Sequence, residues 1–159
     1  MANELIDLVN KVNATIRDER FKRVAISTVL AIQKPRIFDK GQDSTGAKIG
    51  NYSTNPISIS RKNQARDTGI TYFKAGYNQY KSAIGKNQGF VNLRNTDQMM
   101  MDYGIVSSGG DFGLGFQNSL NADKAGWMTE KYQKEIFALS DREIDVYANT
   151  VVAQLNQAL

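Results

Sequence analysis

Carboxylates are the side chains of this sequence that could support acid–base chemistry. The chain contains neither histidine nor cysteine, so it cannot form disulfides, cysteine zinc sites, thiol nucleophiles or a triad with an imidazole base. Each acidic group has a simpler interpretation as a turn, a surface patch or a helix cap. We therefore expect no catalytic residue, and a carboxylate enzyme such as a nuclease or glycosidase is the weakest hypothesis. The acidic groups considered are Asp39/Asp43, Asp97/Asp102 and Asp141/Glu143/Asp145.

Patterns for metals and cofactors are incomplete. Asp39 and Asp43 open a stretch that faintly resembles a calcium loop, but Gly50 stands where the bidentate glutamate should be. The Gly-x-Gly at 113–115 lacks the third glycine of a dinucleotide fingerprint, and the Gly-Lys at 85–86 lacks the first glycine of a phosphate loop. We expect neither a metal nor a cofactor.

The basic residues allow a nucleic-acid hypothesis. The formal net charge is +4, and the 20 lysines and arginines are spread along the chain rather than concentrated. The alternative function is thus a small nucleic-acid-binding module with a basic, tyrosine-containing face. Its candidate DNA-facing residues are Arg61, Lys62 and Arg66, supported by Lys74 and Lys81 beside Tyr77 and Tyr80.

Length and hydropathy suit one globular domain over 1–159. A chain of 159 residues with 41% hydrophobic and 23% charged residues is ordinary for such a domain. No apolar run approaches the roughly 18 residues of a membrane span, and the start lacks the basic and apolar regions of a signal peptide. We expect a protein used inside the cell, or packed into a particle assembled there, without a membrane partner.

Helical periodicity predicts the elements that would position these side chains. One long helix is expected over about 3–32, with a polar stretch at 18–20 that could bend it, and Pro35 should end it. Further helices are expected over 71–84, 96–103 and 121–134. Ser140 and Glu143 form a capping box that starts a last helix running to the C-terminus.

Strand signals complete an α+β prediction. Alternating apolar residues around Gly109-Gly110 predict a hairpin near 105–116. The polar stretch 39–70 looks like an extended loop or arm, within which Ile57 and Ile59 suggest a short strand. We expect long N-terminal and C-terminal helices packed on a small antiparallel sheet. The candidate subunit-interface residues are the adaptable Met99, Met100 and Met101 together with Ile57 and Ile59.

Three stretches together carry a family resemblance. Residues 36–53 contain a short apolar segment, a glycine spacer and a Tyr-Ser turn. Residues 92–100 are similar to a Leu-x-x-Thr-Gly-x-Leu helix start, with Asp97 in place of the glycine. Residues 135–141 are similar to a Phe-Leu-Gly-Leu-Ser-Asp turn. Their order and spacing resemble the Mu-type phage virion morphogenesis (tail-completion) family of head–tail joining proteins.

The resemblance implies a structural function. A member of that family is an α+β subunit of a homo-oligomeric ring at the virion neck, which joins the head to the tail or completes the tail tube, and it has no catalytic residues. The partners would be copies of itself, other neck, portal or tail-tube proteins, and genomic DNA passing through the lumen. The chain would be located in the virion after assembly in the bacterial host cytoplasm.

Overall fold

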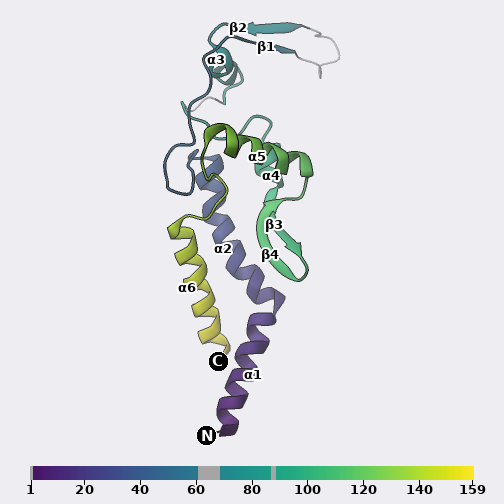
Figure 1. Cartoon of the computed structure of the whole chain (residues 1–159), viewed down its shortest axis with the longest axis vertical. Helices are drawn as coiled ribbons and strands as arrows, with labels where there is room; N and C mark the ends of the chain where they lie inside the picture. Colours follow the sequence, from purple (N-terminus) through teal and green to yellow (C-terminus); the bar gives the residue numbers. More distant parts are fainter. Residues whose placement is uncertain (1, 61–68, 87–88) are drawn as a thin grey trace.

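The computed structural model describes residues 2–60, 69–86 and 89–159, and every structural statement below concerns these residues. Long helices and two small hairpins make up the fold (Figure 1). The elements in chain order are α1 (Ala2–Arg17), α2 (Glu19–Phe38), β1 (Ile57–Ser60), β2 (Ile70–Phe73), α3 (Gly76–Ala83), α4 (Gln98–Asp102), β3 (Tyr103–Ser108), β4 (Asp111–Phe116), α5 (Ser119–Tyr132) and α6 (Asp141–Ala158).

The molecule is elongated, with different elements at its two ends (Figure 1). Helices α1 and α2 follow one another along the long axis, and α6 packs beside α2. The β3–β4 hairpin covers another side of α2, while α4 and α5 lie near the C-terminal end of α2. The β1–β2 hairpin and α3 form the end opposite α1. The predicted α+β class is confirmed, although the sheet is divided into two separate antiparallel pairs.

The expected long N-terminal helix is divided at Asp18. This residue has an extended backbone (φ −65°, ψ 126°), and its side chain accepts a hydrogen bond of 2.6 Å from the backbone N–H of Arg20. That contact is an N-cap, which satisfies one of the free donors at the start of α2. The polar stretch therefore starts a second helix instead of continuing the first.

The prediction that Pro35 ends this helix was wrong. Helix α2 continues through Pro35 to Phe38. Ile37 and Phe38 in this last turn are fully buried, and the backbone N–H of Asp39 still reaches the carbonyl of Pro35 at 3.0 Å. Burial of two large apolar side chains outweighs the local preference of proline, because each contributes about 1.5–3 kcal/mol.

The hydrophobic core lies where the end of α2 meets β3 and the turn before α6. Its buried residues are Ile37, Phe38, Ile49, Val91, Tyr103 and Ile136. The rings of Phe38 and Tyr103 are 5.9 Å apart, and those of Phe116 and Phe137 pack edge to face at 5.3 Å. This cluster fixes the positions of the loops that leave it on either side.

The hairpin expected near 105–116 is confirmed as β3–β4. Ser108 pairs with Asp111 across the turn, and Gly109 and Gly110 both have positive φ angles, 60° and 87°. Two consecutive positive φ angles characterise a type I′ turn, in which glycine is favoured. The first strand starts two residues earlier than expected, with Tyr103 opposite Phe116.

The predicted arm over 39–70 needs correction at its start. Residues 39–50 fold back onto the core: Gln42 bridges Lys48, Asp43 is buried and Ile49 is 2% exposed. Ile49 packs into the hydrophobic core cluster, and this contact holds the preceding turn against the core. The projecting part begins after 50 and contains β1, so the strand predicted at Ile57 and Ile59 is confirmed.

The prediction of a helix over 71–84 was wrong for its first residues. Ile57 pairs with Phe73, which places 70–73 in strand β2. Helix α3 starts only at Gly76, whose φ is +70°. A left-handed residue cannot lie inside an α-helix, so the chain changes from strand to helix at this glycine.

The remaining helices lie close to their predicted ranges. The capping box at Ser140 and Glu143 is present in both directions, and α5 is capped by Asn118, whose side chain accepts from the N–H of Leu120. Helix α4 is shorter than the 96–103 expected. Among the described residues, no helix combines the length and apolarity of a membrane span.

Candidate interaction site

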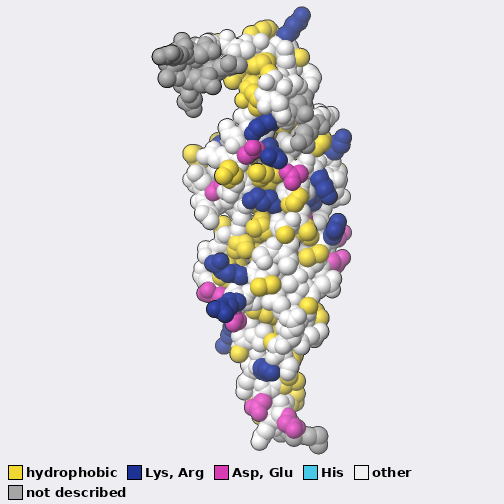
Figure 2. Space-filling model, turned by 180° about the vertical axis from the view of Figure 1, so that it is seen from behind, with side chains coloured by type: hydrophobic (Ala, Val, Ile, Leu, Met, Phe, Trp, Pro, Cys, Tyr) yellow, Lys and Arg dark blue, Asp and Glu magenta, His cyan; other side chains and the backbone are white. Residues whose placement is uncertain are grey.

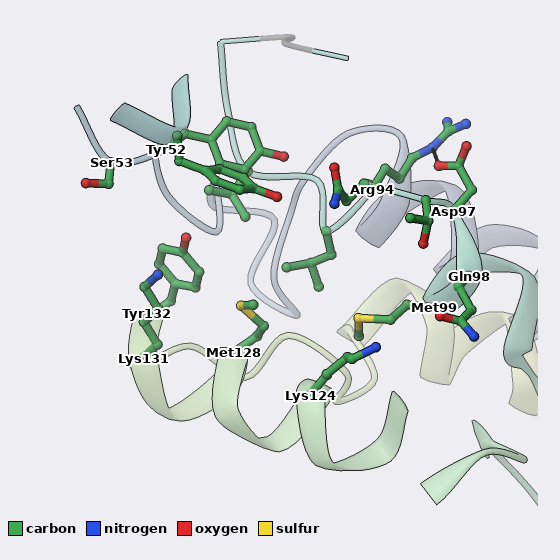
Figure 3. A pocket seen from close by; sticks show the side chains of 15 residues that line it. Tyr52, Ser53, Arg94, Asp97, Gln98, Met99, Lys124, Met128, Lys131 and Tyr132 are labelled. Carbon is green, nitrogen blue, oxygen red and sulfur yellow. Dashed lines mark hydrogen bonds and ion pairs between the residues drawn. The ribbon is translucent and has the colours of Figure 1, made fainter. Parts of the chain in front are cut away.

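A cavity of about 460 Å³ lies between α5, the loop 91–97 and Tyr52 (Figure 3). Its walls come from four separate parts of the chain, and its lining is mainly apolar and aromatic with basic side chains among it. The lining residues are Tyr52, Ser53, Tyr77, Val91, Leu93, Arg94, Asn95, Thr96, Asp97, Gln98, Met99, Lys124, Met128, Lys131 and Tyr132.

Tyrosines form one wall of this cavity. The rings of Tyr52 and Tyr77 are 5.4 Å apart, and Tyr77 packs on Tyr80 at 5.3 Å. The Tyr52 hydroxyl donates to the side-chain oxygen of buried Asn92 at 2.9 Å. The wall is therefore fixed in place, since each ring is held by another ring or by a hydrogen bond.

Ionisation of the Tyr77 hydroxyl should make the stability of the fold depend on pH. Burial raises the pKa of Tyr77 to about 12, from an ordinary value of 10.0. A raised tyrosine pKa means that the fold favours the neutral phenol, so this contribution to stability is complete below pH 10 and is lost as the pH rises towards 12. We expect Tyr77→Phe to reduce the loss of stability between pH 10 and 12, measured by urea unfolding at a series of pH values. Exposed Tyr72→Phe is the control, and an unchanged slope in the Tyr77 variant would contradict the prediction.

Lys81 lies behind the tyrosines and is fully buried. Its ammonium group donates to the backbone carbonyl of Arg94 and lies 5.2 Å from the centre of the Tyr52 ring. Burial lowers the pKa of Lys81. A buried, internally bonded ammonium cannot reach a phosphate backbone, and the rings of Tyr77 and Tyr80 pack against one another at an interplanar angle of 49°. The prediction that Lys81 lies on an exposed, DNA-facing surface was therefore wrong.

The loop 91–97 opposite the tyrosines contains unusual backbone. Leu93 and Asp97 both have left-handed φ angles, 55° and 61°. Such conformations are uncommon for residues other than glycine, and for a bulky side chain they are strained. Strained residues of this kind concentrate at functional sites, where the surroundings hold them in place. Here Leu93 and Asp97 both line the cavity.

Ion pairs hold this loop. The Asp97 carboxylate accepts from Arg94 Nε at 2.9 Å and from Lys86 Nζ at 2.8 Å, and Arg94 Nη1 donates to Asp39 at 3.0 Å. The hydrogen bond from Arg94, with that from Lys86, lowers the pKa of Asp97 to about 2. The same pairing raises the pKa of Arg94.

Asp97→Asn tests this loop without disturbing its backbone, because asparagine also tolerates a left-handed conformation. The carboxylate has a lowered pKa in the fold, so its stabilisation is present above pH 3.8 and is lost as the pH falls towards 2. We expect the variant to lose about 1 kcal/mol at pH 7, a typical value for partly exposed pairs. Its stability should then vary less with pH between 4 and 2 in urea unfolding. A loss that persists unchanged at pH 2 would contradict this explanation.

A stripe along α5 borders the cavity. Leu120, Lys124, Trp127 and Lys131 follow one another at spacings of 4, 3 and 4, so they lie on one side of the helix. Leu120 is 64% exposed and Trp127, the only tryptophan, is 63% exposed. Sequence reasoning predicted the helix but missed this surface, which the same spacing rule could have revealed.

The predicted interface residues lie in different places. Met99 lines the cavity and Met100 packs against the core and α2, whereas Met101 is 76% exposed. Ile57 and Ile59 are half-buried in β1, at the end of the molecule that carries α3. The structure therefore brings one of the five to the cavity and leaves another free on the surface. The DNA-facing candidates Arg61, Lys62 and Arg66 lie outside the described residues.

Two of the candidate carboxylates, Asp43 and Asp102, accept hydrogen bonds from nearby backbone and side-chain groups. Asp43 accepts from the N–H and hydroxyl of Thr45, and Asp102 accepts from Asn118 and Asn121. No group of three or more acidic side chains in the described part of the chain is arranged to hold a metal ion. These contacts position loops and helix ends, and they give the carboxylates structural roles.

A second uncovered surface lies on α1, at the far end of the molecule from the cavity. Five large apolar side chains of α1 are exposed, namely Leu5, Ile6, Leu8, Val9 and Ile16. The N-terminal part of α1 projects beyond the ends of α6 and the β3–β4 hairpin (Figure 1). Figure 2 shows the molecule from behind, with apolar and basic side chains interspersed along its length.

Comparisons with models of protein families, with curated proteins and with solved structures find no match.

Proposed function

We propose that this chain is a structural subunit of a phage virion, which self-associates into a ring at the neck that joins head to tail or completes the tail tube. The observation that carries the self-association is the uncovered apolar stripe of α1. The placement in a virion rests on the family resemblance of 36–53, 92–100 and 135–141.

The α1 stripe supports association because a projecting helix of this kind has little stability alone. Helix α1 has 16 residues, close to the roughly 12–15 below which an isolated helix is marginal in water, and most of the stability of a protein helix comes from packing an amphipathic face. Leu5 is 63% exposed and Val9 half exposed, so the first two turns of this face have no cover among the described residues. Burial of each such side chain would contribute about 1.5–3 kcal/mol.

The charge distribution also supports a neck position. The net charge of +4 is modest, and several basic groups are already paired, for example Lys22 with Asp111 at 3.3 Å. A strongly basic lumen would retain DNA, because each added phosphate contact raises affinity steeply. A weakly basic ring would let DNA pass.

Two measurements test the proposal. The purified chain should have a mass several times that of one copy in light scattering, and the doubly substituted Leu5→Asp/Val9→Asp variant should be monomeric. Mass spectrometry of virions from the host cell should detect the chain among the particle proteins. A chain that is monomeric at every concentration and absent from purified particles would refute the proposal.

A further inference from the structure

Helices α1 and α2 are separated by a single backbone torsion angle. Asp18 lies between them with a φ of −65°, which is already the value of an α-helix, and only its ψ of 126° is extended. The N–H of Asp18 donates to the carbonyl of Thr15 at 3.1 Å, and the N–H of Lys22 donates to the carbonyl of Asp18 at 3.2 Å. Rotation of this one ψ angle to a helical value would therefore join α1 and α2 into one helix.

The hydrogen bonds of the broken and the continuous arrangement oppose one another. In the broken arrangement the Asp18 carboxylate caps α2, since it accepts from the N–H of Arg20 at 2.6 Å. The backbone N–H groups of Glu19 and Phe21 have no protein acceptor among the described residues. A continuous helix would lose the cap, but it would pair these two groups with carbonyls one turn earlier. The local bonds at the junction therefore permit both arrangements.

Helix α6 favours the broken arrangement, because it covers part of the apolar face of α1. In Figure 1, α1 leans towards the C-terminal part of α6, and Lys11 Nζ donates to the carbonyl of Leu159 at 3.1 Å. Exposure falls along this face from 63% at Leu5 to the half-buried Val12. A straight helix would take α1 away from α6 and uncover Val12. The residues of the face are Leu5, Leu8, Val9, Val12 and Ile16.

The apolar face of α1 is out of phase with the buried face of α2. In a continuous helix the two faces would lie roughly 100° apart around the axis, counted at about 3.6 residues per turn. One straight helix could not turn both faces into the core, so the α1 face would point outwards along its whole length. The buried face of α2 includes Ala25, Val29, Gln33, Arg36 and Ile37.

We propose that α6 makes an autoinhibitory contact, which holds α1 in the broken arrangement in a free copy, and that straightening at Asp18 presents the complete apolar face for association between copies. This inference rests on the proposed self-association and adds its control. A neighbouring copy that covers Val12 as well as Leu5 and Val9 binds the straight form better than the broken one. Association therefore shifts the population towards the straight helix.

Two exposed positions at the junction allow each arrangement to be favoured in the full chain. Glu19→Pro should fix the break, because proline suits the first position of α2, lacks the N–H that a continuous helix uses, and keeps the preceding residue extended. Asp18→Ala should favour the straight helix, because it removes the cap and introduces the residue with the highest helix propensity. Glu19→Ala and Asp18→Asn are the matched controls, since alanine lacks the proline ring and asparagine retains a capping oxygen.

Spin labels measure the two arrangements directly. The chain contains no cysteine, so cysteines introduced at exposed Asn3 and Asn156 are the sole labelling sites. Double electron–electron resonance, with labelled chain diluted in unlabelled chain, reports distances within one copy. The straight form should add a population longer by about 10 Å, because the 16 residues of α1 form a lever about 24 Å long. Asp18→Ala should increase this population at least threefold, and Glu19→Pro should remove it.

Light scattering tests the coupling to association. Glu19→Pro should raise the dissociation constant of self-association at least tenfold, and Asp18→Ala should lower it at least threefold. Both controls should match the unaltered chain. The longer distance should also become the main one at concentrations at which the unaltered chain associates. Circular dichroism should show that all four variants fold.

The outcomes separate this inference from the proposed function. If Glu19→Pro and Asp18→Ala leave the label distances unchanged, or if Glu19→Pro associates as the unaltered chain does, the autoinhibitory contact is refuted while self-association stands. If the unaltered chain is monomeric at every concentration, self-association and its control by α6 fail together. Detection in virions decides separately whether the chain is a particle component.

Discussion

Glu143→Ala should destabilise the protein by about 3–5 kcal/mol, the usual cost of removing one partner from a buried ion pair. The Glu143 side chain is 2% exposed, and its carboxylate accepts from Arg36 Nε at 2.7 Å and from the backbone N–H of Ser140 at 2.8 Å. The substitution leaves the Arg36 guanidinium buried with carbonyl partners only, those of Gln42, Ile136 and Ala138. Urea unfolding measures the loss.

Two variants isolate the cause of this effect. Glu143→Gln retains an oxygen that can accept from Ser140 but removes the negative charge, so its loss should lie between those of the alanine variant and the unaltered chain. Asp141→Ala changes an exposed carboxylate in the same helical turn and should cost less than about 1 kcal/mol. A loss under 1 kcal/mol for Glu143→Ala would mean that the pair does not hold α2 to α6.

Gly41→Ala should cost about 2–5 kcal/mol, combining roughly 1–2 kcal/mol for a left-handed backbone with roughly 1–3 kcal/mol for overpacking. Gly41 has φ +61°, and an added β-carbon would overlap the carbonyl oxygen of Val91 and lie 2.5 Å from Phe90 Cδ2. The carbonyl of Gly41 also accepts from the N–H of Ile49 at 2.8 Å, which keeps this turn against the core. Thermal and urea unfolding both report the loss.

Gly46→Ala is the matched control for this substitution. Gly46 has a similar φ of +82°, but no atom lies within 4 Å of an added β-carbon. Its loss should therefore reflect the backbone alone, at roughly 1–2 kcal/mol. Equal losses at the two glycines would show that the loop at Phe90 and Val91 moves aside, and that the turn is less firmly packed than the structure indicates.

Elements determined by local residues could be predicted from the sequence. The capping box at Ser140 and Glu143 starts α6 where expected, and Gly109-Gly110 makes the β3–β4 turn. Both depend on contacts within a few residues, so the sequence pattern contains nearly all of the information. The burial of Glu143 against Arg36, 107 positions away, does not appear in any local pattern.

Elements determined by distant contacts could not be predicted in the same way. Phe73 fits the helical spacing of Tyr77 and Tyr80, yet its pairing with Ile57 places it in a strand. Its ring still packs on Tyr80 at 5.5 Å, so the predicted cluster forms from a different backbone. The cavity itself needs Tyr52, Tyr77, the loop 91–97 and α5 together, and no single window of sequence contains all four.

The single-residue junction at Asp18 has a consequence for the curvature of an assembly. Helix α1 is joined to the rest of the molecule through this junction, and among the described residues it packs mainly on α2 and α6. In the proposed assembly, the torsion angles at Asp18 would set the direction in which each copy presents α1 to its neighbour. A small rotation there, repeated in every copy, would change the number of copies that complete one circle, so the dihedral angles of one residue would govern the diameter of the opening.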